Sequence, residues 1–88
     1  MSQQKHVIIG VHISDRIQHV EPVQHVLTKA GCNIRTRLGL HDADENFCSP
    51  SGLLLLDMIG TDEIHDDMIG KLNLIEGVEA QKMVFDHL

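Results

Sequence analysis

Hydrophobic and polar positions along the chain follow two periods, one typical of strands and one typical of helices. Residues 7–13 are β-branched and apolar on both faces, which predicts a central strand. Residues 34–40 place apolar side chains at every second position, which predicts a strand with one apolar and one polar face. Residues 53–56 are again apolar on both sides, and residues 78–85 form the last predicted strand.

Two segments between these strands have apolar residues three or four positions apart, the spacing of one face of a helix. In the first segment this stripe consists of Ile17, Val20, Val23, Leu27 and Ala30. Pro22 allows two interpretations: the regular helix begins near Val20 with Pro22 in its first turn, or an earlier turn is kinked at Pro22. Gly31 is expected to end this helix.

The second helical segment has Thr61 as its predicted N-cap, and the acidic residues that follow complement the helix dipole. Its predicted buried stripe consists of Ile64, Met68, Leu72 and Ile75. Gly70 inside the helix costs about 1 kcal/mol relative to Ala, and close packing on the sheet is one reason to expect it there. Gly77 is expected to end the helix.

The order strand, helix, strand, strand, helix, strand predicts an α+β fold of the ferredoxin-like type. This βαββαβ sandwich has a four-stranded antiparallel sheet with two helices on one face, and we expect it to form a single domain over residues 1–88. The first and third strands are expected in the centre and the charge-bearing second and fourth at the edges. Because the helices cover one face, apolar residues on the other face, with Met83 or Phe85 nearby, form an exposed patch unless another subunit covers it. We therefore expect a homodimer or a homotetramer.

The segments resemble a family of small ACT-like proteins known as iron-only hydrogenase system regulators. The similar parts are the strand leading into Ser14-Asp15-Arg16, the segment from Gly31 to Leu40, the strand from Leu53 to Gly60, and Ile75-Glu-Gly-Val78. The resemblance implies an ACT-like ferredoxin fold, self-association and no enzymatic activity. More distantly, the chain is similar to the C-terminal metal-sensing domain of the nickel-responsive repressor, through His41 followed by Cys48.

The formal net charge of −6 opposes binding to a polyanion, because non-specific nucleic-acid affinity depends on Lys and Arg neutralising phosphates. We therefore expect no direct nucleic-acid partner. The apolar stretch of residues 7–13 is short and contains His12, so neither a signal peptide nor a membrane span fits, and the expected location is cytoplasmic. Cys32 and Cys48 are expected to be free thiols.

Seven histidines are many for so short a chain, and the predicted topology places them. The first and second strands run parallel and the third runs against them, so His12, His41 and Cys48 are expected toward one end of the sheet. Imidazole and thiolate suit zinc, nickel or copper. Three acidic residues of the nearby turn extend the candidate ligand set: Asp42, Asp44 and Glu45. The alternative is a solvated acidic turn with an inert cysteine, so the cofactor is unknown and a transition metal is the candidate.

At the opposite end of the sheet, the topology allows His6, His65 and His87 to approach one another, and ordinary surface histidines are the preferred alternative. A cluster of this kind would make assembly sensitive to pH near 6 to 7. In ACT-type domains, small ligands usually lie near the loop between the first strand and the first helix. The resemblance therefore implies a ligand site at that loop, which consists of Ser14, Asp15 and Arg16.

At this loop Asp15 and Arg16 could pair with the ammonium and carboxylate groups of an amino acid. Ordinary loop solvation, with Ser14 or Asp15 capping the helix, is the alternative. Arg35 and Arg37, expected on one face of an edge strand, are candidates for contacts with acidic residues of a neighbouring subunit. A solvated face is the other interpretation of these two residues.

The chain has no Gly-rich phosphate loop, nucleophile elbow or pair of acids in a recognisable context, and capping and turns explain its serines, so we do not expect an enzyme. The sequence predicts a small non-catalytic ACT-like regulatory module that self-associates and binds a small ligand or a metal. The resemblance links this module to hydrogenase or anaerobic redox metabolism. The alternative is a structural protein–protein interaction or assembly factor without a ligand.

Overall fold

A computed structural model describes residues 5–14, 16–40 and 52–86, with the side chains of residues 16–20 and 40 outside this description. Its elements follow one another in the predicted order. They are β1 (His6–Ile13), α1 (Arg16–Lys29), the short 3₁₀ helix η1 (Gly31–Asn33), β2 (Ile34–Leu40), β3 (Gly52–Met58), α2 (Asp62–Asn73) and β4 (Val78–Phe85).

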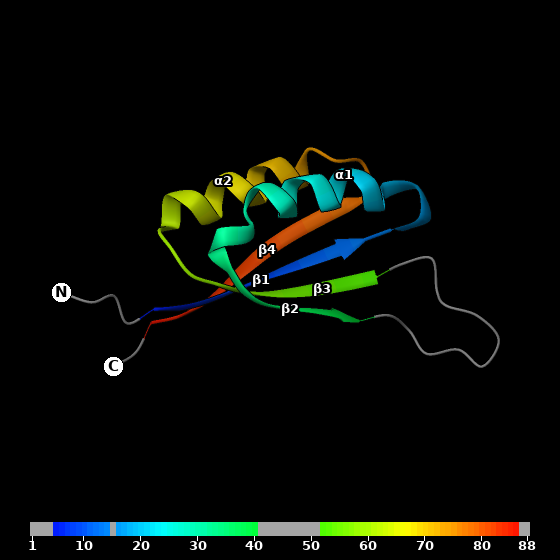
Figure 1. The fold of residues 1–88 in the computed structure, drawn as a ribbon. Helices are drawn as coiled ribbons and strands as arrows, with labels where there is room; N and C mark the ends of the chain where they lie inside the picture. The colour runs from blue at the N-terminus through cyan, green and yellow to red at the C-terminus, as the bar shows by residue number, and fades with distance from the viewer. Residues whose placement is uncertain (1–4, 15, 41–51, 87–88) are drawn as a thin grey trace.

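The four strands form one antiparallel sheet in the order β2-β3-β1-β4. Both helices lie on the same face of this sheet, and the other face carries no element of the described chain (Figure 1). The predicted α+β ferredoxin-like sandwich is therefore confirmed, with β1 and β3 in the centre and β2 and β4 at the edges.

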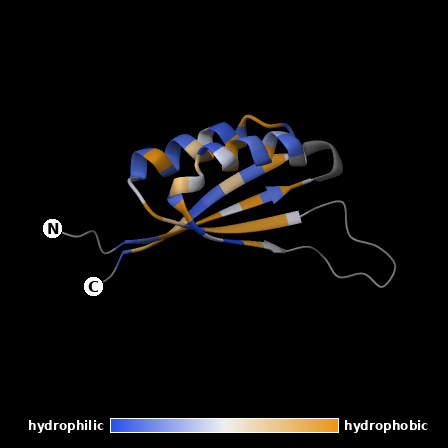
Figure 2. Cartoon of the chain, viewed as in Figure 1, coloured by the Kyte–Doolittle hydropathy of each residue, from blue (hydrophilic) through white to orange (hydrophobic). Residues whose placement is uncertain are grey.

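The core lies between the sheet and the helices and is built from aliphatic side chains and methionine. Alternate residues of β1 provide its centre, and β3, β4 and the two helices provide the rest. Its buried members are Val7, Ile9, Val11, Ile13, Val23, Leu27, Leu56, Met58, Met68, Leu72, Val78 and Ala80. Figure 2 shows the matching hydropathy, with β3 almost continuously hydrophobic and the helices mixed. Full burial of each large side chain contributes about 1.5–3 kcal/mol, so the core needs no aromatic residue.

Helix α1 begins at Arg16 and contains Pro22, which agrees with the interpretation that a turn precedes the proline. Because proline lacks an N–H group, the backbone hydrogen bond from position 22 to the preceding turn is missing. The helix ends at Lys29, before the glycine that was expected to stop it. Gly31 instead begins η1, whose tighter turns lead into β2.

Helix α2 has the predicted cap, because the Thr61 hydroxyl oxygen accepts a hydrogen bond of 3.3 Å from the Ile64 backbone N–H. Its buried stripe differs from the prediction by one position. The buried residues include His65, whereas Ile64 is 37% exposed. The expectation that Gly70 packs closely on the sheet was wrong, because no atom outside its own helix backbone lies within 4 Å of a Cβ built there.

The end of α2 is tied to the edge strand β4 by one side chain. Asn73 Nδ2 donates to the Ala80 carbonyl at 3.1 Å, and Asn73 Oδ1 accepts from the Ala80 N–H at 2.7 Å. These bonds occupy backbone groups at the outer edge of the sheet, where strands otherwise offer a template for pairing. Gly77, in the turn between α2 and β4, has a φ of 83°, which glycine adopts without strain.

Candidate functional site

The face of the sheet away from the helices is largely apolar. The register places β1 residues 6, 8, 10 and 12 on this face, together with their cross-strand partners. We call it the open face and define its apolar part by Ile8, Leu38, Leu53, Leu55, Met83 and Phe85. Leu38, Met83 and Phe85 are 53%, 54% and 43% exposed. An exposed apolar surface of this kind in a soluble domain is typical of an interaction site.

A β-bulge explains why β2 contributes to the open face. Ile34 pairs with Met58 and contacts the core, whereas Thr36 pairs with Asp57 on the opposite face. The extra residue, Arg35, shifts the register by one, and a shift of one exchanges the two faces of a strand. The apolar side chain of Leu38 therefore faces away from the helices, where the regular alternation in the sequence had not placed it.

The same bulge separates the two arginines that were expected on one face. Arg35 reaches the open face, where its guanidinium contacts Asp57. Arg37 pairs with Leu56, whose side chain belongs to the core on the helix side of the sheet. The expectation that Arg35 and Arg37 share a face was therefore wrong, and only Arg35 lies on the open face, where its Nη2 is 3.3 Å from His6 Nε2.

A polar group borders the open face at the end where β1 begins. Arg35 donates two hydrogen bonds to Asp57, at 3.0 and 3.2 Å, and His6 Nε2 lies 2.9 Å from Asp57 Oδ1. The hydrogen bond from Arg35 is the main cause that holds the pKa of the Asp57 carboxyl below its usual range, and His6 acts in the same direction. Burial opposes the shift by favouring the neutral form. The group is thus internally paired, so it can border an apolar contact without leaving a lone charge.

The middle of the open face contains a hollow of about 220 Å³. Gly10 forms its floor, and His12, Leu53, Glu79 and Gln81 surround it. Since glycine has no side chain, the sheet surface is locally depressed between the larger neighbours. A hollow next to the protruding side chain of Met83 gives the open face the relief that two interlocking surfaces need.

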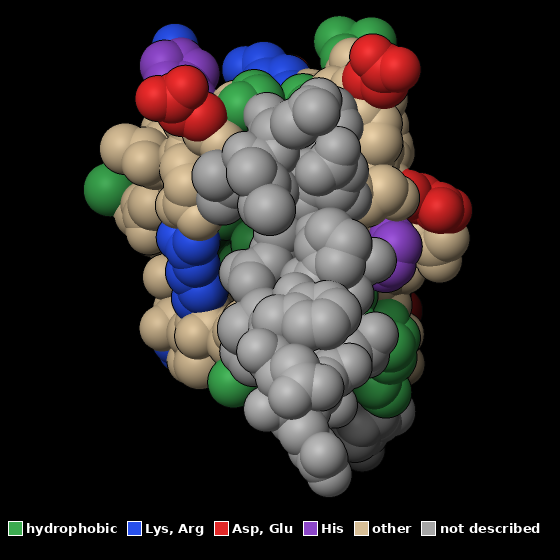
Figure 3. Space-filling view, turned by 90° about the vertical axis from the view of Figure 1, so that its right-hand side faces the viewer, with side chains coloured by type: hydrophobic (Ala, Val, Ile, Leu, Met, Phe, Trp, Pro, Cys, Tyr) green, Lys and Arg blue, Asp and Glu red, His purple; other side chains and the backbone are tan. Residues whose placement is uncertain are grey.

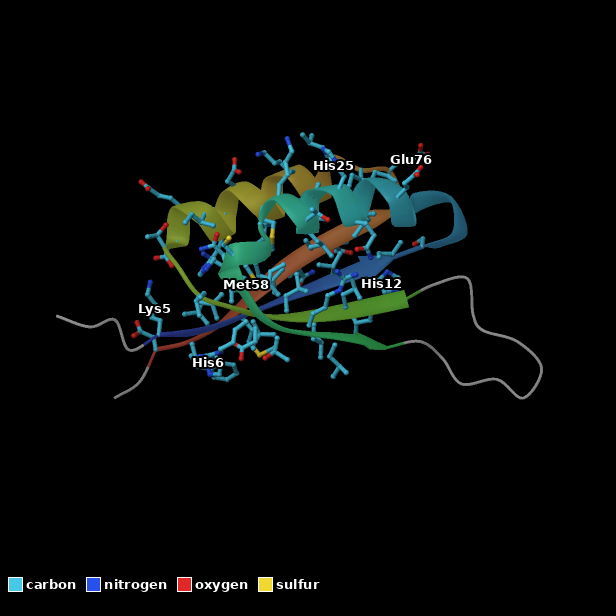
Figure 4. The ribbon with its side chains drawn as sticks, viewed as in Figure 1. Lys5, His6, His12, His25, Met58 and Glu76 are labelled. Atoms are coloured by element: carbon cyan, nitrogen blue, oxygen red, sulfur yellow. The ribbon has the colours of Figure 1, made fainter. Side chains whose placement is uncertain are left out.

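A second, larger pocket of about 460 Å³ lies where β1 begins, β3 ends and α2 begins. We call it the α2 pocket and define it by Lys5, Arg35, Met58, Thr61, Asp62 and His65. Figure 4 shows Lys5 and His6 at this end of the sheet and His12 at the other end. Lys5 Nζ is 2.6 Å from Asp62 Oδ2, which joins the start of β1 to the start of α2. This hydrogen bond raises the pKa of Lys5 and lowers that of Asp62.

His65 is the residue whose environment the sequence predicted least well. It was expected at the surface with His6 and His87, but it is only 2% exposed. Its Nε2 lies 2.9 Å from the Ile59 carbonyl oxygen, which can only accept, so Nε2 carries the hydrogen. Nδ1 is buried and has no hydrogen-bond partner among the described residues. A buried polar atom left unpaired costs about 1–3 kcal/mol, which makes this nitrogen an unusual feature of the protein interior.

Parts of the other sites predicted from the sequence lie outside the described residues. His12 is exposed near the C-terminal end of β1, as expected, but His41 and Cys48 lie outside the description, and so does His87. Within the described chain, no group of three or more His, Cys, Asp and Glu side chains is arranged to hold a metal ion.

The predicted ligand loop is only partly visible. The Ser14 backbone N–H donates to the Gly77 carbonyl at 2.8 Å, which joins the loop to the turn before β4. Asp15 and the side chain of Arg16 lie outside the description. The amino-acid site at this loop therefore stays a prediction, and the α2 pocket lies at the opposite end of the sheet.

Figure 3 shows the side of the molecule that lies at the right in Figure 1, and the acidic and basic side chains of the described residues are scattered over this side. Across the described segments, no helix has the length and hydrophobicity required to cross a membrane.

No protein-family model and no curated protein matches this chain. Among solved structures, the uncharacterized protein TM1266 from Thermotoga maritima has a TM-score of 0.78 at 20% identity, covering 93% of this chain and 99% of that one. A nitrogen regulatory PII-like protein, CPII from Thiomonas intermedia K12, bound to ADP, AMP and bicarbonate, has a TM-score of 0.55 at 9% identity, covering 96% of each chain.

A dimeric ferredoxin-like protein from an uncultured marine organism is also similar, with a TM-score of 0.51 at 8% identity, covering 96% of this chain and 95% of the other. None of these three names refers to a hydrogenase regulator, and none assigns a catalytic activity. At these identities the likeness concerns the fold alone. The chain has the ferredoxin-like fold, which the name of the marine protein also states.

Proposed function

We propose that this protein is a small, non-catalytic ACT-like regulatory module that self-associates through the open face and responds to a small ligand. The observation that carries the proposal is the exposed apolar surface around Leu38, Leu55 and Met83, on the one face that the helices leave bare. A second copy of the chain is the occupant we propose. The resemblance to iron-only hydrogenase system regulators supports a role in anaerobic redox metabolism.

The size of the open face is adequate for a dimer. Four strands about 4.8 Å apart and strands of seven to eight residues at about 3.3 Å per residue give a projected area of roughly 500 Å². Side chains make the accessible surface of a face larger than its projected area. The accessible surface of the open face therefore approaches the roughly 800 Å² per partner of a standard interface. A small domain also gains stability from such burial, because it covers little of its own surface on folding.

The composition of the face supports a partner that is itself apolar. The only ionised side chains described at its β1-start border, Arg35 and Asp57, already neutralise each other. In an isologous contact the same patch meets its own copy. The hollow at Gly10 of each copy can then receive a protruding side chain, such as Met83, from the other copy. This arrangement buries apolar atoms, while Glu79 at the rim of the hollow keeps the hydrogen bond of 2.7 Å that it accepts from Gln81 Nε2.

The experiment compares the solution mass of two variants by light scattering coupled to size-exclusion chromatography. Met83→Asp places a charge on the open face, and we expect it to shift the protein to a monomer. Leu74→Asp is the matched control, since Leu74 is 87% exposed at the end of α2, away from the sheet. Equal masses for the wild type and both variants would contradict the proposal.

The alternative function is an assembly factor whose open face binds another protein without any ligand. The α2 pocket supports the ligand-responsive module, because its volume of about 460 Å³ is in the range of pockets that bind small molecules. A ligand that binds the folded state raises the melting temperature. An assembly factor without a ligand would show the same melting temperature across a panel of small metabolites and transition-metal ions.

A further inference from the structure

One titratable side chain, His6, lies on the open face beside its apolar part. His6 begins β1, and its side chain is 51% exposed in the single chain. Its cross-strand partner is Phe85, whose ring centroid lies 6.4 Å from that of the imidazole. Because Phe85 belongs to the apolar part of the open face, a second copy that covers Phe85 also excludes water from the His6 ring. The protonation of His6 is therefore linked to self-association.

The His6 imidazole lies between a carboxylate and a guanidinium. Its Nε2 is 2.9 Å from Asp57 Oδ1, which only accepts hydrogen bonds, and 3.3 Å from Arg35 Nη2, which only donates them. The neutral ring can serve either neighbour, according to which of its nitrogens carries the hydrogen. The protonated ring has a hydrogen on both nitrogens, so it can donate to Asp57 but meets a like charge on the Arg35 side.

The charge of these three residues decides which form of His6 an interface accepts. Arg35 and Asp57 are paired at 3.0 Å, so the group has no net charge when His6 is neutral and one excess positive charge when His6 is protonated. Covering an excess charge with apolar side chains is costly, because burial disfavours the charged form of an ionisable group. The dimer therefore favours neutral His6, whereas the exposed ring of the monomer accepts the proton.

The other charged side chains near the start of β1 are engaged elsewhere. Lys5 precedes His6, but its Nζ is paired with Asp62 at the start of α2, on the helix side of the sheet. Asp86, which follows β4, acts on Lys5, because it is one of the charges that raise the pKa of that lysine. The excess charge of a protonated His6 is therefore not offset from these positions.

His12 is the second histidine of the open face among the described residues, and its surroundings differ. Its cross-strand partner is Glu79, so the two side chains are neighbours on one face. A protonated His12 beside the Glu79 carboxylate leaves no excess charge. Covering His12 therefore does not require the release of a proton.

We infer that protonation of His6 weakens the self-association through the open face, so that the protein assembles at neutral pH and dissociates in mildly acid solution. This inference concerns the regulation of the proposed interface and rests on that part of the proposed function. Asp57 stays ionised over this range, because the hydrogen bond from Arg35 holds the pKa of its carboxyl below the usual value. Histidine is the side-chain type that changes charge between about pH 5 and pH 8. Each copy thus releases one proton when the dimer forms.

Sedimentation equilibrium of the wild type at pH 7.5 and at pH 5.5, at equal ionic strength, measures the dissociation constant of the dimer. Because two protons leave per dimer, we expect this constant to be at least about tenfold higher at pH 5.5. A dimer with the same dissociation constant at both pH values would overturn this inference and leave the proposed interface standing. A monomer at pH 7.5 would overturn the proposed self-association and this inference with it.

Two variants of His6 assign the effect to this side chain. His6→Gln stays neutral and retains an amide that can donate to Asp57, so its dissociation constant should be nearly the same at both pH values. His6→Lys is charged at both pH values, so its dimer at pH 7.5 should be at least about tenfold weaker than that of the wild type. A pH dependence that survives in His6→Gln, or a His6→Lys dimer as tight as that of the wild type, would overturn the inference.

His25→Gln is the matched control. His25 is exposed on α1, and Figure 4 shows His6 and His25 on opposite sides of the sheet. We expect this variant to retain the pH dependence of the wild type, because the open face does not include His25. Loss of the pH dependence in His25→Gln would overturn the assignment to His6.

Discussion

The bond pair between Asn73 and Ala80 allows a prediction whose size can be worked from the structure. In Asn73→Ala, the Ala80 N–H and C=O lose their partners at 2.7 and 3.1 Å. Each of these hydrogen bonds has a net worth of about 1 kcal/mol. Alanine has a better helix propensity than asparagine by about 0.5 kcal/mol, which offsets part of the loss. We therefore expect a free energy of unfolding lower by about 1.5 kcal/mol.

This loss corresponds to a melting temperature lower by roughly 6–12 °C for a domain of this size. Urea denaturation of wild type and variant at the same protein concentration is the direct assay, because oligomerisation makes apparent stability depend on concentration. Asn73→Asp is the matched variant: it retains an oxygen acceptor for the Ala80 N–H but loses the donor, so we expect a smaller loss than for alanine. A loss below about 0.5 kcal/mol in Asn73→Ala, within the range of ordinary surface substitutions, would refute the role given to this side chain.

Two further predictions concern backbone and charge. Gly70→Ala should stabilise the protein by about 0.5–1 kcal/mol, since a Cβ there meets no atom within 4 Å outside its own helix backbone. Gly60→Ala should destabilise it, because Gly60 has a φ of 106° and its Cβ would lie 2.6 Å from Asn33 Nδ2. The urea midpoints of the two variants check both signs. The hydrogen bond from Arg35 holds the pKa of Asp57 below its ordinary value of 3.8, so the stability that Asp57 contributes is present above that value and is lost as the pH falls through the lower pKa of the folded state. Between about pH 5 and about pH 3, the urea midpoint of Asp57→Asn should therefore fall less than that of the wild type; an equal fall would contradict this account.

The sequence predicted the fold well because periodicity reports which residues face a core. The order of elements, the central position of β1 and β3, and the Thr61 cap all follow from local patterns that the structure retains. The bare apolar face also followed, since both helices of this topology lie on one side of the sheet. These features depend on the pattern of many residues, so no single misplaced side chain alters them.

The details of the site depend on single-residue shifts that periodicity does not reveal. The bulge at Arg35 moves Leu38 to the open face and separates Arg35 from Arg37, yet the alternating sequence reads as a regular strand. His65 replaces Ile64 in the buried stripe because its Nε2 finds the Ile59 carbonyl, a partner set by the loop before the helix. Spacing did not separate the two residues, because His65 lies three and seven positions and Ile64 four and eight positions before Met68 and Leu72, and all these spacings return to one face of a helix.

The most direct test of self-association through the open face is a solvent-accessibility measurement on the wild-type protein. Methyl NMR signals would be recorded with and without a soluble paramagnetic compound that broadens exposed groups. If a second copy covers the open face, Leu38 and Met83, which are 53% and 54% exposed in the single chain, are protected, while Leu74 at 87% is broadened. Broadening of Leu38 and Met83 in proportion to these exposures would contradict the account, because it would show that the open face is bare in solution.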